Sequence, residues 1–186
     1  MRLCDCGGKL ESQRLFKHED KRLGLPGVRI MLYNAVTLER CALCKRVESV
    51  TVSDLEGLIA AVAVSRVLHP AKLNGGEILF LRKALELTGK ELAALLEVNE
   101  QTVSRWENDV DPIGPQSEKL LRRLVGDRLS DRAPCIDFNA EMVYALQINT
   151  INVRPLHFDF TLIEDKEGMA NQAEEGWKQG AVRKTG

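Results

Sequence analysis

Apolar residues recur at helical spacing through the middle of the chain, and polar capping residues divide this pattern into short helices. The stretch 53–68 is predicted to be a helix, because Ser53 is a good N-cap and Glu56 stands where a capping-box acid would reach back. His69-Pro70 ends this helix, since the residue before a proline disfavours the helical conformation. Four or five further short helices are predicted over 74–125.

A break in the chain or a capping residue marks the start of three of these short helices. The first begins at about Glu77, just after a glycine-rich break in the chain. The second spans Gly89–Leu96, with Thr88 as its N-cap. The third spans Glu100–Asn108, with Asn99 as its N-cap. Two short helices joined by a tight turn are typical of a helix-turn-helix.

The third helix has an apolar side and a polar side. Val103 and Trp106 are three residues apart and are predicted to face inward. The side chains left outside are those of Gln101, Thr102, Ser104 and Arg105. Glutamine suits a bidentate contact with adenine, arginine suits guanine, and the two hydroxyls suit phosphates or a thymine methyl. The pattern favours a recognition helix over an ordinary small bundle with a solvated polar face.

The flanks of the helical region carry weaker strand patterns. Residues 28–33 and 35–38 are candidate strands in a turn-rich unit over 1–50. Residues 143–146 and 158–162 are further candidate strands, and the polar tail from Asp165 is expected to be disordered.

Four cysteines stand in two short pairs, Cys4/Cys6 and Cys41/Cys44. Thiolates in such pairs suit tetrahedral Zn²⁺, and four of them leave no open position, so the predicted zinc is structural. Two alternatives stay open: reduced thiols without metal, or one ligand replaced by His18 or Asp5. The lone Cys135 is interpreted as a free thiol.

Composition constrains the function classes. The formal net charge is −1, from 26 basic and 27 acidic residues, so DNA binding would need a local surface and specific side chains. No signal-like or membrane-spanning apolar stretch is visible, so a cytoplasmic location without a membrane partner is expected, where cysteines stay reduced. The three histidines are scattered and no nucleophile or paired carboxylates stand out, so no enzyme is expected.

The sequences LTGKELA at 87–93 and VNEQTVSRWEN at 98–108 resemble the Cro/repressor (XRE) helix-turn-helix family. One departure is Gly89, where the family often has a phosphate-contacting glutamine; Lys90 or a backbone amide is a candidate replacement. Glu100 is a candidate for a cytosine amino group or for stabilising the start of its helix. The predicted DNA-binding residues are Lys90, Glu100, Gln101, Thr102, Ser104, Arg105 and Asn108.

The order of cysteine pairs, linker helix and LFLRK at 79–83 entering the XRE domain resembles the MqsA-type (YgiT-type zinc finger) antitoxin and regulator family over about 1–127. The resemblance implies a structural zinc domain that can bind a toxin. It also implies a helix-turn-helix domain that dimerises on palindromic operator DNA, with Gln101 and Arg105 reading bases. The one-residue spacing between Cys4 and Cys6 departs from the family, and the extension beyond about 130 has no counterpart in it.

The expected fold class is α+β: a small N-terminal zinc-binding strand unit, an all-α lambda-repressor-like domain, and a C-terminal extension with candidate strands. The expected division is 1–50, a linker helix at 51–73, the helix-turn-helix domain at 74–130, the extension at 131–164 and the tail at 165–186. The expected function is a dimeric transcriptional repressor that binds double-stranded DNA. The alternative is an antitoxin that neutralises a toxin protein through its zinc domain. A small-molecule sensor in 132–164 is a further hypothesis without positive evidence.

Overall fold

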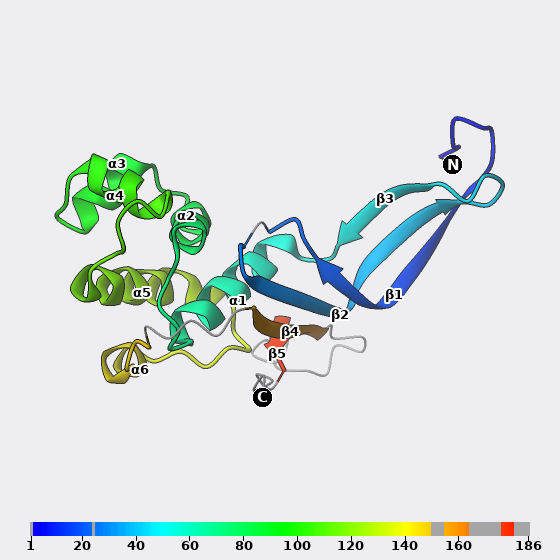
Figure 1. Ribbon diagram of the computed structural model, residues 1–186. Helices are drawn as coiled ribbons and strands as arrows, with labels where there is room; N and C mark the ends of the chain where they lie inside the picture. Colours follow the sequence, from blue (N-terminus) through cyan, green and yellow to red (C-terminus); the bar gives the residue numbers. More distant parts are fainter. Residues whose placement is uncertain (1, 24, 150–154, 164–175, 181–186) are drawn as a thin grey trace.

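The computed structural model of this protein describes residues 2–23, 25–149, 155–163 and 176–180. A twisted sheet forms an arm at one end of the molecule, a group of helices forms a body at the other, and α1 lies between them (Figure 1). In chain order the elements are β1 Leu10–Asp20, β2 Val28–Cys41, β3 Val47–Val52, α1 Leu55–Leu68, α2 Gly75–Ala84, α3 Gly89–Leu95, α4 Glu100–Glu107, α5 Pro115–Leu129, the 3₁₀ turn η1 Ser130–Arg132, α6 Ala140–Ala145, β4 Leu156–Ile163 and β5 Gly176–Gln179.

The sheet is built around β2. On one side, β1 pairs antiparallel along almost all of β2. On the other side, β3 pairs antiparallel with residues 36–40, and β4 pairs parallel with residues 28–33. β5 then pairs antiparallel with β4. The C-terminal extension therefore completes a sheet that the N-terminal segment begins, and the fold mixes strands and helices as the expected class did.

The two candidate strands at 28–33 and 35–38 are parts of the single strand β2, and a β-bulge separates them. Between the pairs Leu15–Val36 and Lys17–Tyr33, β2 has two residues where β1 has one. Asn34 at this bulge has a φ of 54°, a left-handed conformation that asparagine tolerates better than most residues. A bulge increases the local twist of a strand pair, and the strands of the arm are visibly twisted in Figure 1.

Two expectations for the C-terminal part are wrong. Residues 143–146 do not form a strand, because residues 140–145 form helix α6, whose N-cap Asn139 accepts a hydrogen bond from Glu141 N. The tail is not disordered throughout, because Gly176–Gln179 forms β5. Trp177 in β5 is 1% exposed, so its burial in the core stabilises this strand in a polar segment. The expected strand at 158–162 is confirmed by β4, and the rest of the tail lies outside the described residues.

The predicted helix at 53–68 is present as α1, but its N-cap is Asp54 and not Ser53. The Asp54 carboxylate accepts a hydrogen bond from Gly57 N at 3.0 Å, and its main-chain carbonyl accepts one from the Trp177 indole N–H at 2.9 Å. From Gly57 to Val67 almost every residue of α1 is buried. A helix that is buried on all sides is the centre of a core, so α1 is more than a linker between two units.

Four charged side chains are buried next to the C-terminal end of α1. Arg66 donates to Glu77 through two hydrogen bonds of 2.6 and 3.0 Å. Arg122 donates to Glu118 at 2.8 and 3.2 Å. All four residues are 0% exposed. Burial and the nearby Arg66 charge lower the pKa of Arg122, and the hydrogen bond to Glu118 opposes this shift.

The same guanidinium groups also satisfy main-chain carbonyls. The carbonyls at the end of α1 and in the following loop that accept from Arg66 or Arg122 are those of Val67, His69, Ala71 and Lys72. Glu118 accepts in turn from Leu73 N at 2.9 Å. The last carbonyls of a helix have no partner within the helix, so these contacts join α1, α2 and α5 at one point.

We expect Arg66→Met to lower the free energy of unfolding by about 3–5 kcal/mol, because it leaves the Glu77 carboxylate buried without its cation. Urea denaturation followed by circular dichroism measures the change. The matched control is Arg128→Met on α5, where the side chain is exposed and the loss should be below about 1 kcal/mol. Equal stability of the two variants would contradict the structural role of the buried pair.

Candidate nucleic-acid interface and metal centre

Each helix of the helix-turn-helix region begins at a capping side chain. Asn74 and Glu77 form a complete capping box at the start of α2, so this helix begins two residues before the expected Glu77. Thr88 and Glu91 form a second capping box at α3, and Asn99 accepts from Gln101 N at the start of α4. The expected N-caps Thr88 and Asn99 are confirmed.

The same three helices end in the same way. Glu86, Glu97 and Asp109 have φ values of 59°, 54° and 54°, directly after the helices. In each case the next amide donates back to a carbonyl five residues earlier, as in the bond from Val98 N to Ala93 O at 2.9 Å. These are Schellman motifs, in which a left-handed residue reverses the chain and satisfies terminal carbonyls. The turn between α3 and α4 is therefore held by its own main chain.

The inner sides of α3 and α4 pack into the core, and Val103 and Trp106 face inward as the sequence predicts. Leu92, Ala93, Val103 and Trp106 are all buried. The small Ala93 lets the two short helices approach each other at their crossing. This packing fixes which side of α4 faces outward.

An ion pair inside the domain fixes the end of α4. Arg82 on α2 donates to the Glu107 carboxylate at 2.6 and 3.0 Å, and also to Leu87 O. The hydrogen bond to Glu107 raises the pKa of Arg82. Arg82 is therefore a structural partner of Glu107 inside the domain.

The predicted DNA-binding side chains lie on one outer surface. Most of them are exposed and Thr102 is half-buried; the exposed ones are Lys90, Glu100, Gln101, Ser104, Arg105 and Asn108. A Cβ built on Gly89 would lie 3.9 Å from the Glu100 carboxylate, so the starts of α3 and α4 are neighbours. Lys90 is therefore close to the N-terminal half of α4, as a phosphate contact beside a base-reading helix would require.

One neighbour of this surface was missed from the sequence. Asp111, in the turn after α4, accepts a hydrogen bond and forms an ion pair with Arg105. This contact raises the pKa of Arg105 and lowers the pKa of Asp111. The two side chains are 54% and 49% exposed, so the pair is weak and can open. Only the fold of the turn brings Asp111 back to Arg105, six residues earlier.

The four cysteines of the two pairs meet at the tip of the arm, far from the helices (Figure 1). Their Sγ atoms all lie within 4.8 Å of one another. The Cys4–Cys44 and Cys6–Cys41 sulfur distances are 3.6 and 3.4 Å. Four thiolates bound to Zn²⁺ at about 2.3 Å would be about 3.8 Å apart, so this donor set fits a tetrahedral zinc.

The alternative ligands do not join this cluster. His18 pairs with Leu32 further along the sheet, and the Asp5 carboxylate, 91% exposed, pairs with Arg46 at 3.3 Å. The one-residue spacing between Cys4 and Cys6 is accommodated by a tight turn in which Gly7, with a φ of 79°, donates to Cys4 O.

The environment of the thiols differs from one to the next. Main-chain N–H groups, that of Cys44 above all, lower the pKa of Cys41 to about 6. For Cys4 the main-chain N–H of Cys6 acts in the same direction, but the Glu48 carboxylate accepts from this thiol at 3.1 Å, and with desolvation the pKa of Cys4 is raised. Bound Zn²⁺ would hold all four sulfurs as thiolates and stabilise a tip that has little apolar core.

Gly8 is a residue of the site whose steric role the sequence did not reveal. A Cβ at this position would lie 2.5 Å from Cys41 Sγ, which is closer than real side chains approach. Cys41 therefore packs against position 8, where only glycine leaves room for its sulfur atom.

Residues 78–123 match the family model described as Helix-turn-helix, a family of DNA-binding, non-enzymatic domains. No curated protein and no solved structure matches the chain. The matched residues begin in α2 and end in α5, so they contain both capped helices and the outer surface of α4. The chain therefore carries an XRE-type helix-turn-helix domain. Within the described residues, no helix combines the length and the apolar character that a membrane span requires.

We expect the purified protein to bind one zinc per chain and Gly8→Ala to bind it about 10- to 100-fold more weakly, because the added methyl group displaces Cys41. Competition with a chromogenic chelator measures the affinity. The matched control is Gly114→Ala, where a Cβ meets nothing within 4 Å. Unchanged zinc affinity in Gly8→Ala would contradict the assignment of the four cysteines.

Proposed function

We propose that this protein is a sequence-specific DNA-binding transcriptional regulator that acts as a dimeric repressor. The observation that carries the proposal is the outer surface of α4. Its exposed side chains stand on a helix whose start, end and inner face are all held by the domain. In this arrangement α4 enters the major groove, and Gln101 and Arg105 read base edges.

Arg105 has a specific place in this proposal. In the free protein its guanidinium is held by Asp111. A guanine offers two acceptors to the same group, and a wrong base does not. Arg105 has to leave Asp111 before it can bind DNA. Only a guanine at the matching position offers enough to replace that contact, so the affinity depends on the base there.

The proposed dimer is supported by exposed apolar side chains on the far side of the helical body. Leu120 on α5 is 48% exposed, and Met142 and Tyr144 on α6 are 41% and 63% exposed. The Arg123 guanidinium lies 5.6 Å from the centre of the Tyr144 ring. An exposed apolar surface of this kind suits association with a second copy of the chain.

The proposed role of Zn²⁺ is structural. The cysteine cluster lies at the tip of the arm and α4 lies in the helical body (Figure 1). Four thiol ligands leave no coordination position for a substrate. Metal removal would therefore destabilise the tip and leave the contacts of α4 with DNA in place.

We expect Arg105→Ala to weaken binding to the DNA upstream of the protein's own gene by about 1–3 kcal/mol, because one bidentate base contact is lost. Fluorescence anisotropy at fixed ionic strength measures the affinity, and scrambled DNA of the same length measures the non-specific part. The variant should lose preference for the specific sequence more than it loses affinity for scrambled DNA.

The matched control is Arg40→Ala, which removes the same charge from an exposed position on β2. It should bind specific DNA like the unchanged protein. Equal, weak and salt-sensitive binding by all three proteins, to the upstream DNA and to sequences selected from a random pool, would contradict the proposal.

A second candidate function, an antitoxin, is favoured by the surface of the arm. Leu3, Phe16, Leu43 and Val47 are between 41% and 72% exposed, and they lie on strands or turns of the arm. An exposed group of large apolar side chains on a thin sheet is typical of a protein-binding surface. The partner would be a growth-inhibiting protein encoded beside this one.

Co-expression of this chain should restore growth of cells that produce the neighbouring protein, and Leu43→Asp should abolish the rescue, because a charge would then be buried at the interface. The Leu43→Asp variant should still bind DNA, since this residue is far from α4. Rescue that is independent of Leu43, or a neighbouring protein without toxicity, would contradict the antitoxin role.

A further inference from the structure

The turn between α4 and α5, residues 109–113, carries the carboxylate that holds Arg105. The conformation of this turn is strongly restricted. Asp109 has a left-handed φ of 54°, and the ring of Pro112 fixes the φ of that residue. Asp111 stands directly before this proline, which disfavours the helical conformation for it. Few free rotations remain between residues 109 and 113, so the points that hold the two ends of the turn decide where Asp111 lies.

The start of the α4–α5 turn is held by the first residue of α2. The Asp109 carboxylate accepts a hydrogen bond from Gly75 N at 2.6 Å. A Cβ built on Gly75 would lie 2.5 Å from Glu107 O and 2.6 Å from Trp106 O, which is closer than real side chains approach. The start of α2 therefore lies directly against the end of α4, and the bond to Asp109 joins the turn to this contact.

The end of the α4–α5 turn is held by Lys72. The Lys72 ammonium donates to Ile113 O at 2.7 Å and to the Glu118 carboxylate at 3.2 Å. Ile113 is buried in the core, and the Lys72 side chain is only 22% exposed. A charged donor that is largely shielded from water makes a strong hydrogen bond. The carbonyl of Ile113 is therefore fixed two residues after Asp111.

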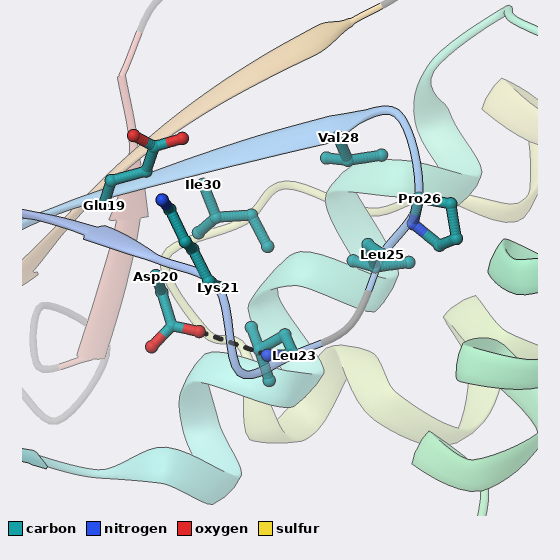
Figure 2. A pocket seen from close by; sticks show the side chains of 8 residues that line it. All are labelled: Glu19, Asp20, Lys21, Leu23, Leu25, Pro26, Val28 and Ile30. Carbon is teal, nitrogen blue, oxygen red and sulfur yellow. Dashed lines mark hydrogen bonds between the residues drawn. The ribbon is translucent and has the colours of Figure 1, made fainter.

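The loop of residues 69–74 between α1 and α2 carries Lys72 and leads directly into α2. This loop is itself held from several sides. Lys72 N donates to Asn149 O at 3.0 Å, and buried guanidinium groups donate to two carbonyls of the loop. The Asn74 side chain donates to Pro26 O at 3.2 Å, and Figure 2 shows this proline at the end of the β1–β2 hairpin. The two points that hold the α4–α5 turn therefore have a firm support.

We propose that Lys72 and Asp109 are positioning residues of the DNA-reading surface, because they fix the α4–α5 turn so that Asp111 meets Arg105. An exposed ion pair is weak by itself and is lost when its two side chains are free to move apart. With a loose turn, Arg105 would have no fixed partner and would bind any phosphate. The affinity for unrelated DNA would then rise, and the preference for the specific sequence would fall.

An NMR titration of the Asp111 carboxyl group in the full-length protein, without DNA, tests the positioning directly. The contact with Arg105 lowers the pKa of Asp111. In Lys72→Met and in Asp109→Ala this pKa should rise toward that of an ordinary aspartate, because the carboxylate no longer lies beside the guanidinium. The matched controls are Lys72→Arg, which keeps a charged donor, and Asp109→Asn, which loses the same charge as Asp109→Ala but keeps an acceptor oxygen. Both controls should keep the pKa of Asp111 low.

Fluorescence anisotropy with upstream and scrambled DNA tests the consequence, which rests on the proposed function. The ratio of the two affinities should fall about 5-fold or more in Lys72→Met and in Asp109→Ala, since one good base contact supplies discrimination of about 5- to 150-fold. The double variant Lys72→Met/Asp111→Asn should be no less selective than Asp111→Asn alone, because Lys72 acts through Asp111. Lys178→Met on β5 removes the same charge from an exposed position and should keep the full ratio.

The positioning role is overturned if the pKa of Asp111 stays low in both Lys72→Met and Asp109→Ala. It is also overturned if these variants bind specific and scrambled DNA equally more weakly, as a loss of stability alone would cause, or if the losses in the double variant add. If Lys72→Met does not fold, Asp109→Ala decides the outcome, because Asp109 is exposed and its removal leaves no buried charge without a partner. If the unchanged protein prefers no DNA sequence, the proposed function is refuted and the NMR titration alone decides the positioning.

Discussion

The buried pairs Arg66–Glu77 and Arg122–Glu118 hold the helical body together. They place two cations at the carbonyl end of α1, where a helix has partial negative charge and unpaired acceptors. The loop that follows α1 donates and accepts within the same network, through Leu73 N and the Ala71 carbonyl. Buried charges are costly unless every partner is present, so this arrangement permits one relative placement of α1, α2 and α5.

Helix α1 also connects the sheet to the helical body. α1 is fixed to the helix-turn-helix domain by this network and to the sheet by the Trp177 contact with Asp54. β4 and β5 join the sheet beside β2, and Trp177 of β5 bonds to Asp54 at the start of α1, so the C-terminal strands connect the sheet to α1. The arm is therefore attached to the helical body by a packed core and not by a flexible segment.

The outer surface of α4 and the cysteine cluster depend on different interactions. The outer surface of α4 presents polar side chains held by capped and Schellman-terminated helices, and its charge is small because Asp111 and Glu100 stand among the candidate contacts. The overall charge of −1 agrees with this, since recognition then depends on matched hydrogen bonds more than on general attraction to phosphate. The cysteine cluster instead brings four sulfur atoms together at the tip, and Gly8 leaves the room that Cys41 needs there.

The sequence by itself determined the features that depend on residues a few positions apart. Capping spacings placed α3 and α4 to within about a residue, because a cap and its partner are three residues apart on one turn. The short cysteine pairs predicted which four residues cluster, because thiols this close in sequence can share one ion. Residues 143–146 and the tail were misjudged, because short apolar runs fit a helix or a strand equally well and burial of Trp177 depends on distant residues. Only the tertiary structure decided that the C-terminal strands complete the sheet, that Arg66 and Arg122 share one buried network, that Asp111 holds Arg105, and that Pro26 of the β1–β2 hairpin touches α2. Each of these joins residues distant in sequence or turned together by a loop, and no local pattern encodes which partner a buried charge or a strand edge will find.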